Sequence, residues 1–284
     1  MTFRHNTDIG QNFLKDLSVA DWMVKRASLG AADVVLEIGP GSGSLTKRIL
    51  QENCARLHAI ELDRRLAPDL DPIASSDRRL SLHWGDAVKF DYSLLESAPT
   101  HVVANLPYHI TTPLIWRLLE LYSGSGMSYM LIMAQAEAAD RMTCGAGSRA
   151  SNPLSITIEA VADAHTLRRV PRSAFFPMPR VDSAIVEIKF SRDRGALSNL
   201  PRDEKWRRLL SGSFAARRKT LANNWGGSFR ASREMCAEIL SSHSLKPLSR
   251  PEELASGDWI ALHEAGALSK MEGRKNGRDP LRGL

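Results

Sequence analysis

Along the first 190 residues, short apolar runs alternate with stretches in which apolar residues recur every three or four positions. Each run is about as long as a buried strand, and the stretches between the runs are typical of helices that cover a sheet. This alternation predicts an α/β domain in which helices lie on both faces of a mainly parallel sheet. The strands expected from the runs are 34–38, 57–61, 80–84, 101–104, 129–133 and 184–190.

From about residue 195 the pattern changes to helical segments with basic faces. The chain therefore predicts an α/β domain at 1–194 and a small α-helical domain at 195–271. The remaining stretch, 272–284, is rich in Gly, Arg and Lys, and because such a composition cannot bury a core we expect a disordered tail. The helices expected in the second domain are 205–218, 233–242 and 250–264.

Charge is distributed unevenly between the two expected domains. Residues 1–190 hold 20 Lys and Arg against 21 Asp and Glu, whereas residues 191–284 hold 18 against 11. A basic region of this kind suits a nucleic-acid partner, because Lys and Arg contacts to phosphate release counterions and dominate affinity. The alternative interpretation is a basic surface that only keeps the protein in solution.

Composition also bears on location and on metal binding. No window approaches the ~20 apolar residues of a membrane span, and the first residues lack the apolar core of a secretory signal. We therefore expect a cytoplasmic protein without a membrane partner, and we expect it to be a monomer. The three cysteines, Cys54, Cys144 and Cys236, are far apart and match no metal-ligand spacing, so we expect free thiols and no metal.

A glycine run follows the first expected strand. In Glu37-x-Gly39-x-Gly41-x-Gly43, small residues stand where a strand turns into a helix, which lets the backbone approach a ligand closely. The spacing differs from the G-x-G-x-x-G of dinucleotide binders. Taken alone, the run can also be an ordinary tight turn.

Two acids follow the next two strands. Glu61 ends the second strand, at the distance from the glycine run typical of an acid that accepts hydrogen bonds from ribose hydroxyls. Asp86 follows the third strand, where its carboxylate can accept from an adenine amine. Each acid alone can be a solvated strand end. With the glycine run, they predict a nucleoside pocket without a pyrophosphate site, and S-adenosylmethionine is the candidate cofactor.

The fourth expected strand ends in Asn105-Leu106-Pro107-Tyr108. The N6 nitrogen of adenine is a poor nucleophile because its lone pair is delocalised into the ring. The Asn105 side-chain oxygen and the Leu106 carbonyl can each accept one N6 hydrogen, which would turn the lone pair toward a methyl donor. Tyr108 would stack on an extruded base. The alternative is a proline turn with an aromatic ring packed beneath it.

These motifs together resemble the rRNA adenine N6,N6-dimethyltransferase family, in its small-subunit branch. The resemblance covers most of residues 10–190 and continues into the basic helical region. The segments that carry it are Gln11-Asn12-Phe13-Leu14, the glycine run, Glu61-Leu62-Asp63, Gly85-Asp86-Ala87, Asn105-Leu106-Pro107-Tyr108, the proline-rich 174–184, Phe214-Ala215-Ala216-Arg217-Arg218-Lys219-Thr220-Leu221 and Arg250-Pro251-Glu252-Glu253-Leu254.

The resemblance implies a Rossmann-like class I methyltransferase domain that uses S-adenosylmethionine. It implies dimethylation of two adjacent adenosines near the 3′ end of small-subunit (16S) rRNA during ribosome biogenesis, with the small ribosomal subunit and its rRNA as partners. Arg217, Arg218 and Lys219 would bind RNA in the helical domain. Cofactor contacts are implied at Asn12, Leu14, Gly39, Glu61, Asp86 and Asn105, and we extend the expected pocket to Gln11, Gly41, Leu62 and Ala87.

The target adenine is expected between two aromatic rings. The resemblance places Phe175 opposite Tyr108, with Asn105 and Leu106 holding the amine. Without the resemblance, Phe175 would be read as a core aromatic at the start of a proline-rich loop.

The chain departs from the family pattern at Ala136, at Asn152-Pro153 and at His109. These changes affect loops around the target site, whereas the cofactor and amine motifs are complete. Two other functions stay open at this point. One is a large-subunit (23S) rRNA adenine methyltransferase of the antibiotic-resistance type, and the other is a non-catalytic ribosome-assembly or transcription factor on the same fold.

Overall fold

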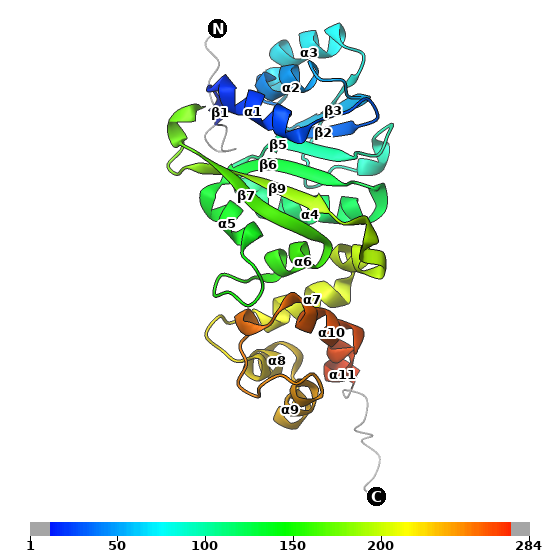
Figure 1. Ribbon diagram of the computed structural model, residues 1–284, viewed down its shortest axis with the longest axis vertical. Helices are drawn as coiled ribbons and strands as arrows, with labels where there is room; N and C mark the ends of the chain where they lie inside the picture. Colours follow the sequence, from blue (N-terminus) through cyan, green and yellow to red (C-terminus); the bar gives the residue numbers. More distant parts are fainter. Residues whose placement is uncertain (1–11, 274–284) are drawn as a thin grey trace, which may run out of the picture. The chain divides into compact units, whose positions relative to one another are not determined.

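The computed structural model describes residues 12–273, which form two compact units (Figure 1). The α/β unit comprises the chain up to Thr143 and the segment Ala162–Gly195. The helical unit comprises the segment Cys144–Val161 and the chain from Ala196 onward. The later boundary between the units falls between Gly195 and Ala196, and the change of pattern was placed between residues 194 and 195. The segment Cys144–Val161, however, was expected in the first domain and groups with the helices.

Two hydrogen bonds show why this segment belongs to the helical unit. Its helix α6 (Pro153–Val161) is apolar and buried on most sides. The Trp206 indole N–H donates to the Thr157 hydroxyl at 2.9 Å, and the Ser256 hydroxyl donates to the Glu159 carboxylate at 3.0 Å. Both partners of the Trp206–Thr157 bond are buried, which makes that bond costly to lose. Sequence order alone cannot reveal such a pairing.

The α/β unit is built on a seven-stranded sheet. In spatial order its strands are β4 (Leu80–Trp84), β3 (Arg56–Glu61), β2 (Val34–Ile38), β5 (His101–Asn105), β6 (Tyr129–Gln135), β9 (Ser183–Phe190) and β7 (Ala162–Val170) (Figure 1). The strands from β4 to β6 are parallel, and β9 and β7 are each antiparallel to the strand before them. The strand order reverses between β2 and β5, and ligands of open α/β sheets bind beyond the carboxyl ends at such a reversal. The predicted α/β fold is confirmed.

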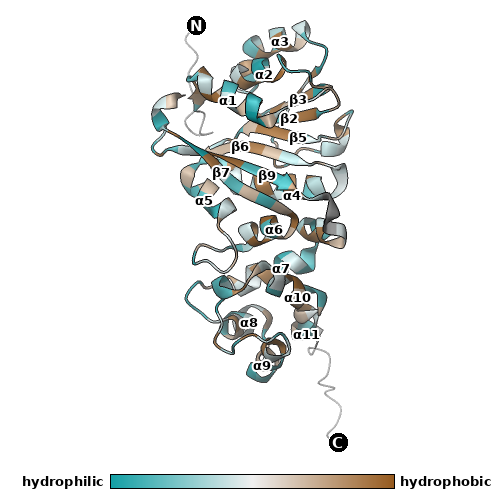
Figure 2. Ribbon diagram, in the orientation of Figure 1, coloured by the Kyte–Doolittle hydropathy of each residue, from teal (hydrophilic) through white to brown (hydrophobic). Residues whose placement is uncertain are grey.

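Six of the seven strands lie at the predicted apolar runs. The sequence missed β7, which alternates apolar with charged positions and pairs only with β9. Figure 2 shows the difference, since the central strands are largely brown and β7 also carries teal. An edge strand with one solvated face needs no continuous apolar run.

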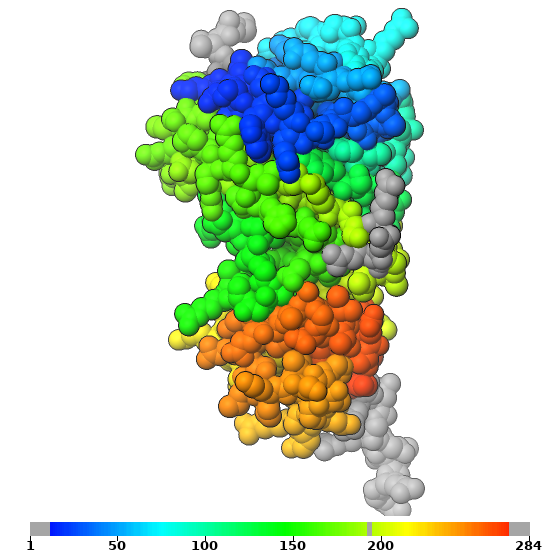
Figure 3. All heavy atoms as spheres, viewed as in Figure 1, coloured from blue at the N-terminus to red at the C-terminus, as the bar shows by residue number. Residues whose placement is uncertain are grey.

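Five helices accompany the sheet: α1 (Leu17–Ala27), α2 (Ser44–Ile49), α3 (Ala67–Ser76), α4 (Thr111–Ser125) and α5 (Ala136–Thr143). The Asp16 side chain caps α1 by accepting from the Ser18 backbone N–H at 3.1 Å. A separate ribbon pairs β1 (Phe13–Leu14) with β8 (Phe175–Phe176). In the space-filling view the blue N-terminal atoms accordingly lie beside yellow-green atoms from later in the chain (Figure 3).

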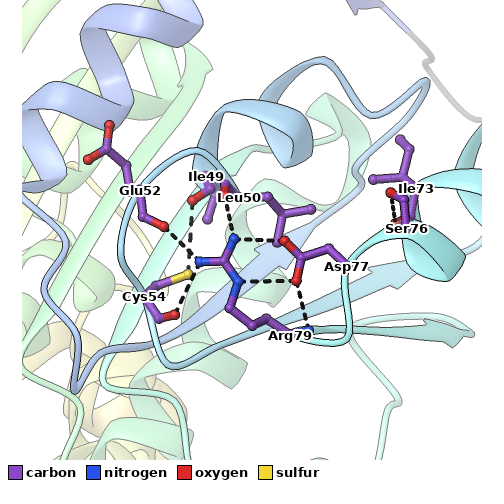
Figure 4. Close-up of polar contacts among 8 residues, drawn as sticks. All are labelled: Ile49, Leu50, Glu52, Cys54, Ile73, Ser76, Asp77 and Arg79. Carbon is purple, nitrogen blue, oxygen red and sulfur yellow. Dashed lines mark hydrogen bonds and ion pairs between the residues drawn. The ribbon is translucent and has the colours of Figure 1, made fainter.

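Arg79 ties the end of α2 to the loop before β4 (Figure 4). Its guanidinium donates to the backbone carbonyls of Leu50 and Glu52, the latter at 2.8 Å, and to the Asp77 carboxylate at 2.7 Å. Carbonyls at a helix end have no partner within the helix, and a cation satisfies them well. These contacts join the segments that precede β3 and β4.

The helical unit has its own core. It contains α7 (Glu204–Ser213), α8 (Leu221–Phe229), α9 (Arg233–Ser242), α10 (Ser256–Glu264) and α11 (Ala267–Gly273). Trp206, Trp225 and Trp259 are each 0% exposed, so the unit buries three large aromatic side chains among its helices.

Two boundaries in the helical unit differ from the prediction. The helix expected at 205–218 ends at Ser213, where α7 stops, and the expected helix 250–264 begins only at Ser256. The first two residues of the expected tail, Glu272 and Gly273, end α11, and Glu272 pairs with Arg208. The rest of that tail, 274–284, lies outside the described residues.

In the described part of the chain, no helix is long and apolar enough to cross a membrane. The three cysteines are free thiols, as expected. Among the side chains that the structure describes, no group of three or more His, Cys, Asp or Glu could hold a metal ion.

Candidate active site

A pocket in the α/β unit lies beyond the carboxyl ends of β4, β3, β2 and β5. All four motif clusters predicted from the sequence contribute to its wall, together with residues of β1. Parallel strands bring their carboxyl ends to one edge of the sheet, which explains why clusters far apart in the chain meet here. The lining residues are 12–14, 37–42, 44–45, 60–62, 85–87 and 105–110.

The glycine turn follows β2 and is held against β3, where the Gly39 N–H donates to the Ile60 carbonyl at 2.9 Å. Gly41 has a φ of +60°, and a Cβ there would stand 3.1 Å from the Phe13 ring. Gly43 has a φ of +81°, and a Cβ would stand 2.4 Å from Ile73. Both positions therefore need glycine for conformation and for space. The turn is built for close approach to a ligand.

Glu61 lies at the end of β3 and is 6% exposed. One carboxylate oxygen accepts from the Gly41 N–H at 3.1 Å and the other from the Asp63 N–H at 2.8 Å. Burial raises the pKa of Glu61, and these backbone donors oppose the shift. Glu61 therefore joins the glycine turn to the next strand as well as facing the pocket.

The loop after β4 supplies a second acid. Asp86 accepts from the Val88 N–H at 2.9 Å, and its other oxygen lies 3.9 Å from the Lys89 ammonium. Ala87 is nearly buried, and its carbonyl accepts from the Tyr92 hydroxyl at 2.8 Å. Leu62 is 51% exposed, so a large apolar side chain stands at the pocket wall without full burial. Such a side chain suits the face of a nucleoside base.

Asn105 ends β5 at the strand-order reversal. Its Oδ1 atom is buried and has no hydrogen-bond partner among residues 12–273. The next residue, Leu106, donates its N–H to the Met133 carbonyl at 2.9 Å, and its side chain is 1% exposed. This bond anchors the turn to β6, and the amide oxygen of Asn105, a residue of the pocket wall, is an unused acceptor.

Tyr108 follows Pro107 and is partly exposed at the pocket. Its hydroxyl shares a 2.6 Å hydrogen bond with the Ser183 hydroxyl at the start of β9. Burial raises the pKa of Tyr108, and the bond from Ser183 opposes this shift, so the phenol is neutral near pH 7. The hydroxyl contact fixes the orientation of the ring.

Asn12, just before β1, and Leu14, within it, line the pocket, whereas Gln11 lies outside the described residues. Phe175 is not among the residues that line this pocket, and its role as a second stacking wall stays a prediction. It is 1% exposed, belongs to the apolar core of the α/β unit, and is absent from the pocket wall. Its pairing with Leu14 in the ribbon buries the ring, and the neighbouring Phe176 is 58% exposed instead.

We expect Phe175→Ala to lower the free energy of unfolding by about 3–5 kcal/mol, because it removes a buried aromatic ring and leaves a cavity. Urea unfolding measures this. Phe176→Ala is the matched control, and since that ring is mostly exposed its effect should stay within about 0.5 kcal/mol. Equal stabilities for the two variants would contradict a core role for Phe175.

The sequence reading gave no role to two residues that the structure brings to the site. Phe13 lines the pocket and contacts the Gly41 turn, and Ser183 holds the Tyr108 hydroxyl. Both residues occur inside segments that carry the family resemblance. Their position in those segments was the sequence signal that could have indicated a role at the site. His109, to which no role was assigned, also lines the pocket and is exposed.

The basic triplet Arg217, Arg218 and Lys219 lies in the helical unit and is exposed. It was predicted on a helix, but it stands in the turn between α7 and α8. The Arg217 guanidinium donates to the Arg149 carbonyl at 3.5 Å, which brings the loop before α6 beside this turn.

The sheet order and this site define a Rossmann-like methyltransferase. The glycine turn, the two acids and the asparagine-proline turn meet at the strand-order reversal, where such enzymes act. Comparison with known proteins identifies the group more closely: the family model of ribosomal RNA adenine dimethylase matches residues 2–261, and the chain belongs to that family. The predicted resemblance is confirmed.

Curated relatives agree with this assignment. The chain is 37% identical over 263 residues to ribosomal RNA small subunit methyltransferase A of Rubrobacter xylanophilus, covering 92% of this chain and 95% of the relative. The protein of the same name from Syntrophotalea carbinolica is 35% identical over 273 residues, covering 95% and 98%.

Two solved structures show the same fold. A dimethyladenosine transferase from Plasmodium falciparum superposes with a TM-score of 0.73 at 25% identity, covering 89% of this chain and 98% of that one. The 23S rRNA methyltransferase ErmE superposes with a TM-score of 0.64 at 19% identity, covering 92% and 100%, and this likeness concerns the fold alone.

Proposed function

We propose that the protein uses S-adenosylmethionine to convert two adjacent adenosines near the 3′ end of small-subunit (16S) rRNA to N6,N6-dimethyladenosine. The observation that carries the proposal is the Asn105 Oδ1 atom, a buried acceptor without a partner in the described chain, at the wall of the pocket. The names of the curated relatives support the small subunit as the substrate and ribosome biogenesis as the context. A cytoplasmic monomer remains our expectation.

The pocket fits the cofactor by the chemistry of its donors and acceptors. Glu61 would accept from the ribose hydroxyls, Asp86 from the adenine amine, and Leu62 would cover a face of the base. A Cβ at Gly41 would stand 3.1 Å from the Phe13 ring, so glycine lets the turn lie close against Phe13 in the pocket wall. When bound, the cofactor supplies an electrophilic methyl group on a positively charged sulfur.

The residues of the Asn105 turn would prepare the nucleophile. The Asn105 side-chain oxygen and the Leu106 carbonyl accept the two N6 hydrogens, which draws the nitrogen toward tetrahedral geometry and frees its lone pair. Tyr108 stacks on the extruded adenine. The 2.6 Å hydrogen bond between the Tyr108 and Ser183 hydroxyls holds the tyrosine ring in place. No strong base is needed, because the alkylated amine is acidic and releases its proton to solvent.

To test the proposal, the purified protein is incubated with labelled S-adenosylmethionine and one of three substrates. These are small subunits from a strain that lacks the modification, mature modified small subunits, and large subunits. We expect label only in the first, recovered as N6,N6-dimethyladenosine. Label in large subunits would instead establish the 23S alternative. No label in any of them would contradict the enzyme proposal and favour the non-catalytic assembly role.

Tyr108→Ala should lower kcat/KM by an amount equivalent to ~1–3 kcal/mol, the usual value of base–aromatic stacking. Tyr108→Phe keeps the ring and loses only the hydrogen bond to Ser183, so it should keep most of the activity. Single-turnover transfer to unmodified small subunits measures both. If phenylalanine were as damaging as alanine, the hydroxyl would take part in the chemistry and the stacking role would be wrong.

The helical unit is the proposed RNA-binding part of the molecule. Replacing Arg217, Arg218 and Lys219 with glutamine should weaken small-subunit binding and flatten its dependence on salt. Each lost phosphate contact lowers the slope of log affinity against log salt concentration by ~0.7–0.9 in magnitude. Sedimentation with small subunits at several salt concentrations measures this, and cofactor affinity should not change.

A charge-matched control removes the same charge elsewhere. Lys25, Lys47 and Arg78 are exposed residues of the α/β unit, and their replacement with glutamine should leave the salt slope nearly unchanged. If both triple variants lowered the slope equally, the effect would be one of net charge, and the basic turn would have no special role.

A further inference from the structure

One carboxyl group of the pocket has no part in the proposed chemistry. Glu37 lies on β2, two residues before the glycine turn, and lines the pocket. Its side chain is 1% exposed, and its Oε2 atom has no hydrogen-bond partner in residues 12–273. A buried carboxyl oxygen without a partner is costly unless the group is neutral or a ligand completes it.

The surroundings of Glu37 hold the group in its neutral form. Burial raises its pKa to about 8, polar groups of Thr46 on α2 oppose the shift, and the negative charge of Glu61 on β3 adds to it. No ion pair of the described chain includes Glu37. The cation Arg48 on α2 is directed to Asp21 instead.

Two further titratable groups, Asp86 and His109, line the same pocket from the loop after β4 and the turn after β5. Three acidic residues, Glu37, Glu61 and Asp86, therefore line one pocket, and the first two are almost fully buried. No Lys or Arg side chain lines the pocket of the described chain. A cavity with this set of groups favours a ligand that brings positive charge.

We propose that Glu37 is a charge-recognising residue of the cofactor pocket, neutral in the free protein and ionised when the positively charged part of S-adenosylmethionine binds. The O–H bond of the carboxyl breaks, the electron pair stays on the oxygen, and the proton leaves to solvent. The cation of the ligand then stabilises the carboxylate that burial had disfavoured. This inference rests on the proposed function, because it takes S-adenosylmethionine as the ligand.

Proton release is measurable without any methyl transfer. Calorimetry of S-adenosylmethionine binding at pH 7, in buffers of different ionisation enthalpy, should show about one proton released per bound cofactor beyond that seen for Glu37→Gln. The matched ligand is 5′-deoxy-5′-methylthioadenosine, which keeps the adenosine and sulfur but has no positive charge. It should release no proton from either protein.

The dissociation constant provides a second readout in the wild-type protein. The affinity for S-adenosylmethionine should tighten about tenfold per pH unit up to about pH 8 and level off above it, as expected for release of one proton. The affinity for methylthioadenosine should stay flat over the same range. These measurements need no variant, so they hold even if Glu37→Gln does not fold.

Stability of the free protein tests the neutral state by itself. Since the pKa of Glu37 is raised on folding, the wild type loses stability as pH rises from the ordinary glutamate value of 4.5 toward 8, while Glu37→Gln does not. The variant should therefore have a higher Tm than the wild type at pH 8 and lose that advantage at pH 4.5.

Three results would overturn the inference: the same proton release in Glu37→Gln, the same release with methylthioadenosine, or a wild-type affinity for S-adenosylmethionine that is independent of pH. If S-adenosylmethionine did not bind at all, the proposed function itself would fail. Binding without Glu37-dependent proton release would leave that function intact and remove only the role assigned to Glu37.

Discussion

Replacing Asn105 with alanine is expected to reduce methyl transfer by about 10²-fold or more while leaving the fold intact. Loss of one oriented polar contact in a transition state typically has an effect of this size. The fold should survive because the Asn105 Oδ1 atom has no partner in the described chain, so its removal leaves no buried donor unpaired.

Single-turnover transfer to unmodified small subunits measures the rate, and thermal unfolding checks the fold. Asn53→Ala is the matched control, since Asn53 is exposed in the loop between α2 and β3 and far in sequence from the pocket residues of β5. Asn105→Asp keeps acceptor oxygens and should fall between alanine and wild type. A well-folded Asn105→Ala protein with the wild-type rate would rule out the proposed role of this amide.

The second large effect is expected at Glu61. Glu61→Ala should weaken S-adenosylmethionine binding about 10²-fold, because hydrogen bonds to a charged group are each worth ~1.5–3 kcal/mol. The substitution removes the proposed ribose acceptor and also the two bonds, at 3.1 Å and 2.8 Å, that join the carboxylate to Gly41 and Asp63. The glycine turn would thus lose its tie to β3.

Calorimetry with S-adenosylmethionine measures the loss, and sedimentation shows whether the variant still binds small subunits, as we expect from the basic character of residues 191–284. Glu238→Ala on α9 replaces an exposed glutamate and should change neither quantity. Unchanged cofactor affinity in Glu61→Ala would mean that the nucleoside is held elsewhere.

The local pattern of apolar and polar residues was sufficient to predict most strands of the sheet and the motif residues that line the pocket. The expected strands 34–38 and 80–84 became β2 and β4 with the same bounds, because a short segment between turn residues buries its apolar side chains most readily as a strand. The grouping of the motif residues at one edge of the sheet followed from the same information. In a parallel sheet the residues after successive strands share one edge, so Glu61, Asp86 and Asn105 had to meet.

Contacts between distant segments account for what the pattern missed. Phe175 is buried because β8 pairs with β1. The segment Ala162–Val170 forms a strand because it hydrogen-bonds to the edge of β9. Cys144–Val161 joins the helical unit through the bond of Thr157 to Trp206. In each case the structure of a segment depends on which other segment packs against it or pairs with it. That other segment lies too far along the chain for local periodicity to identify it.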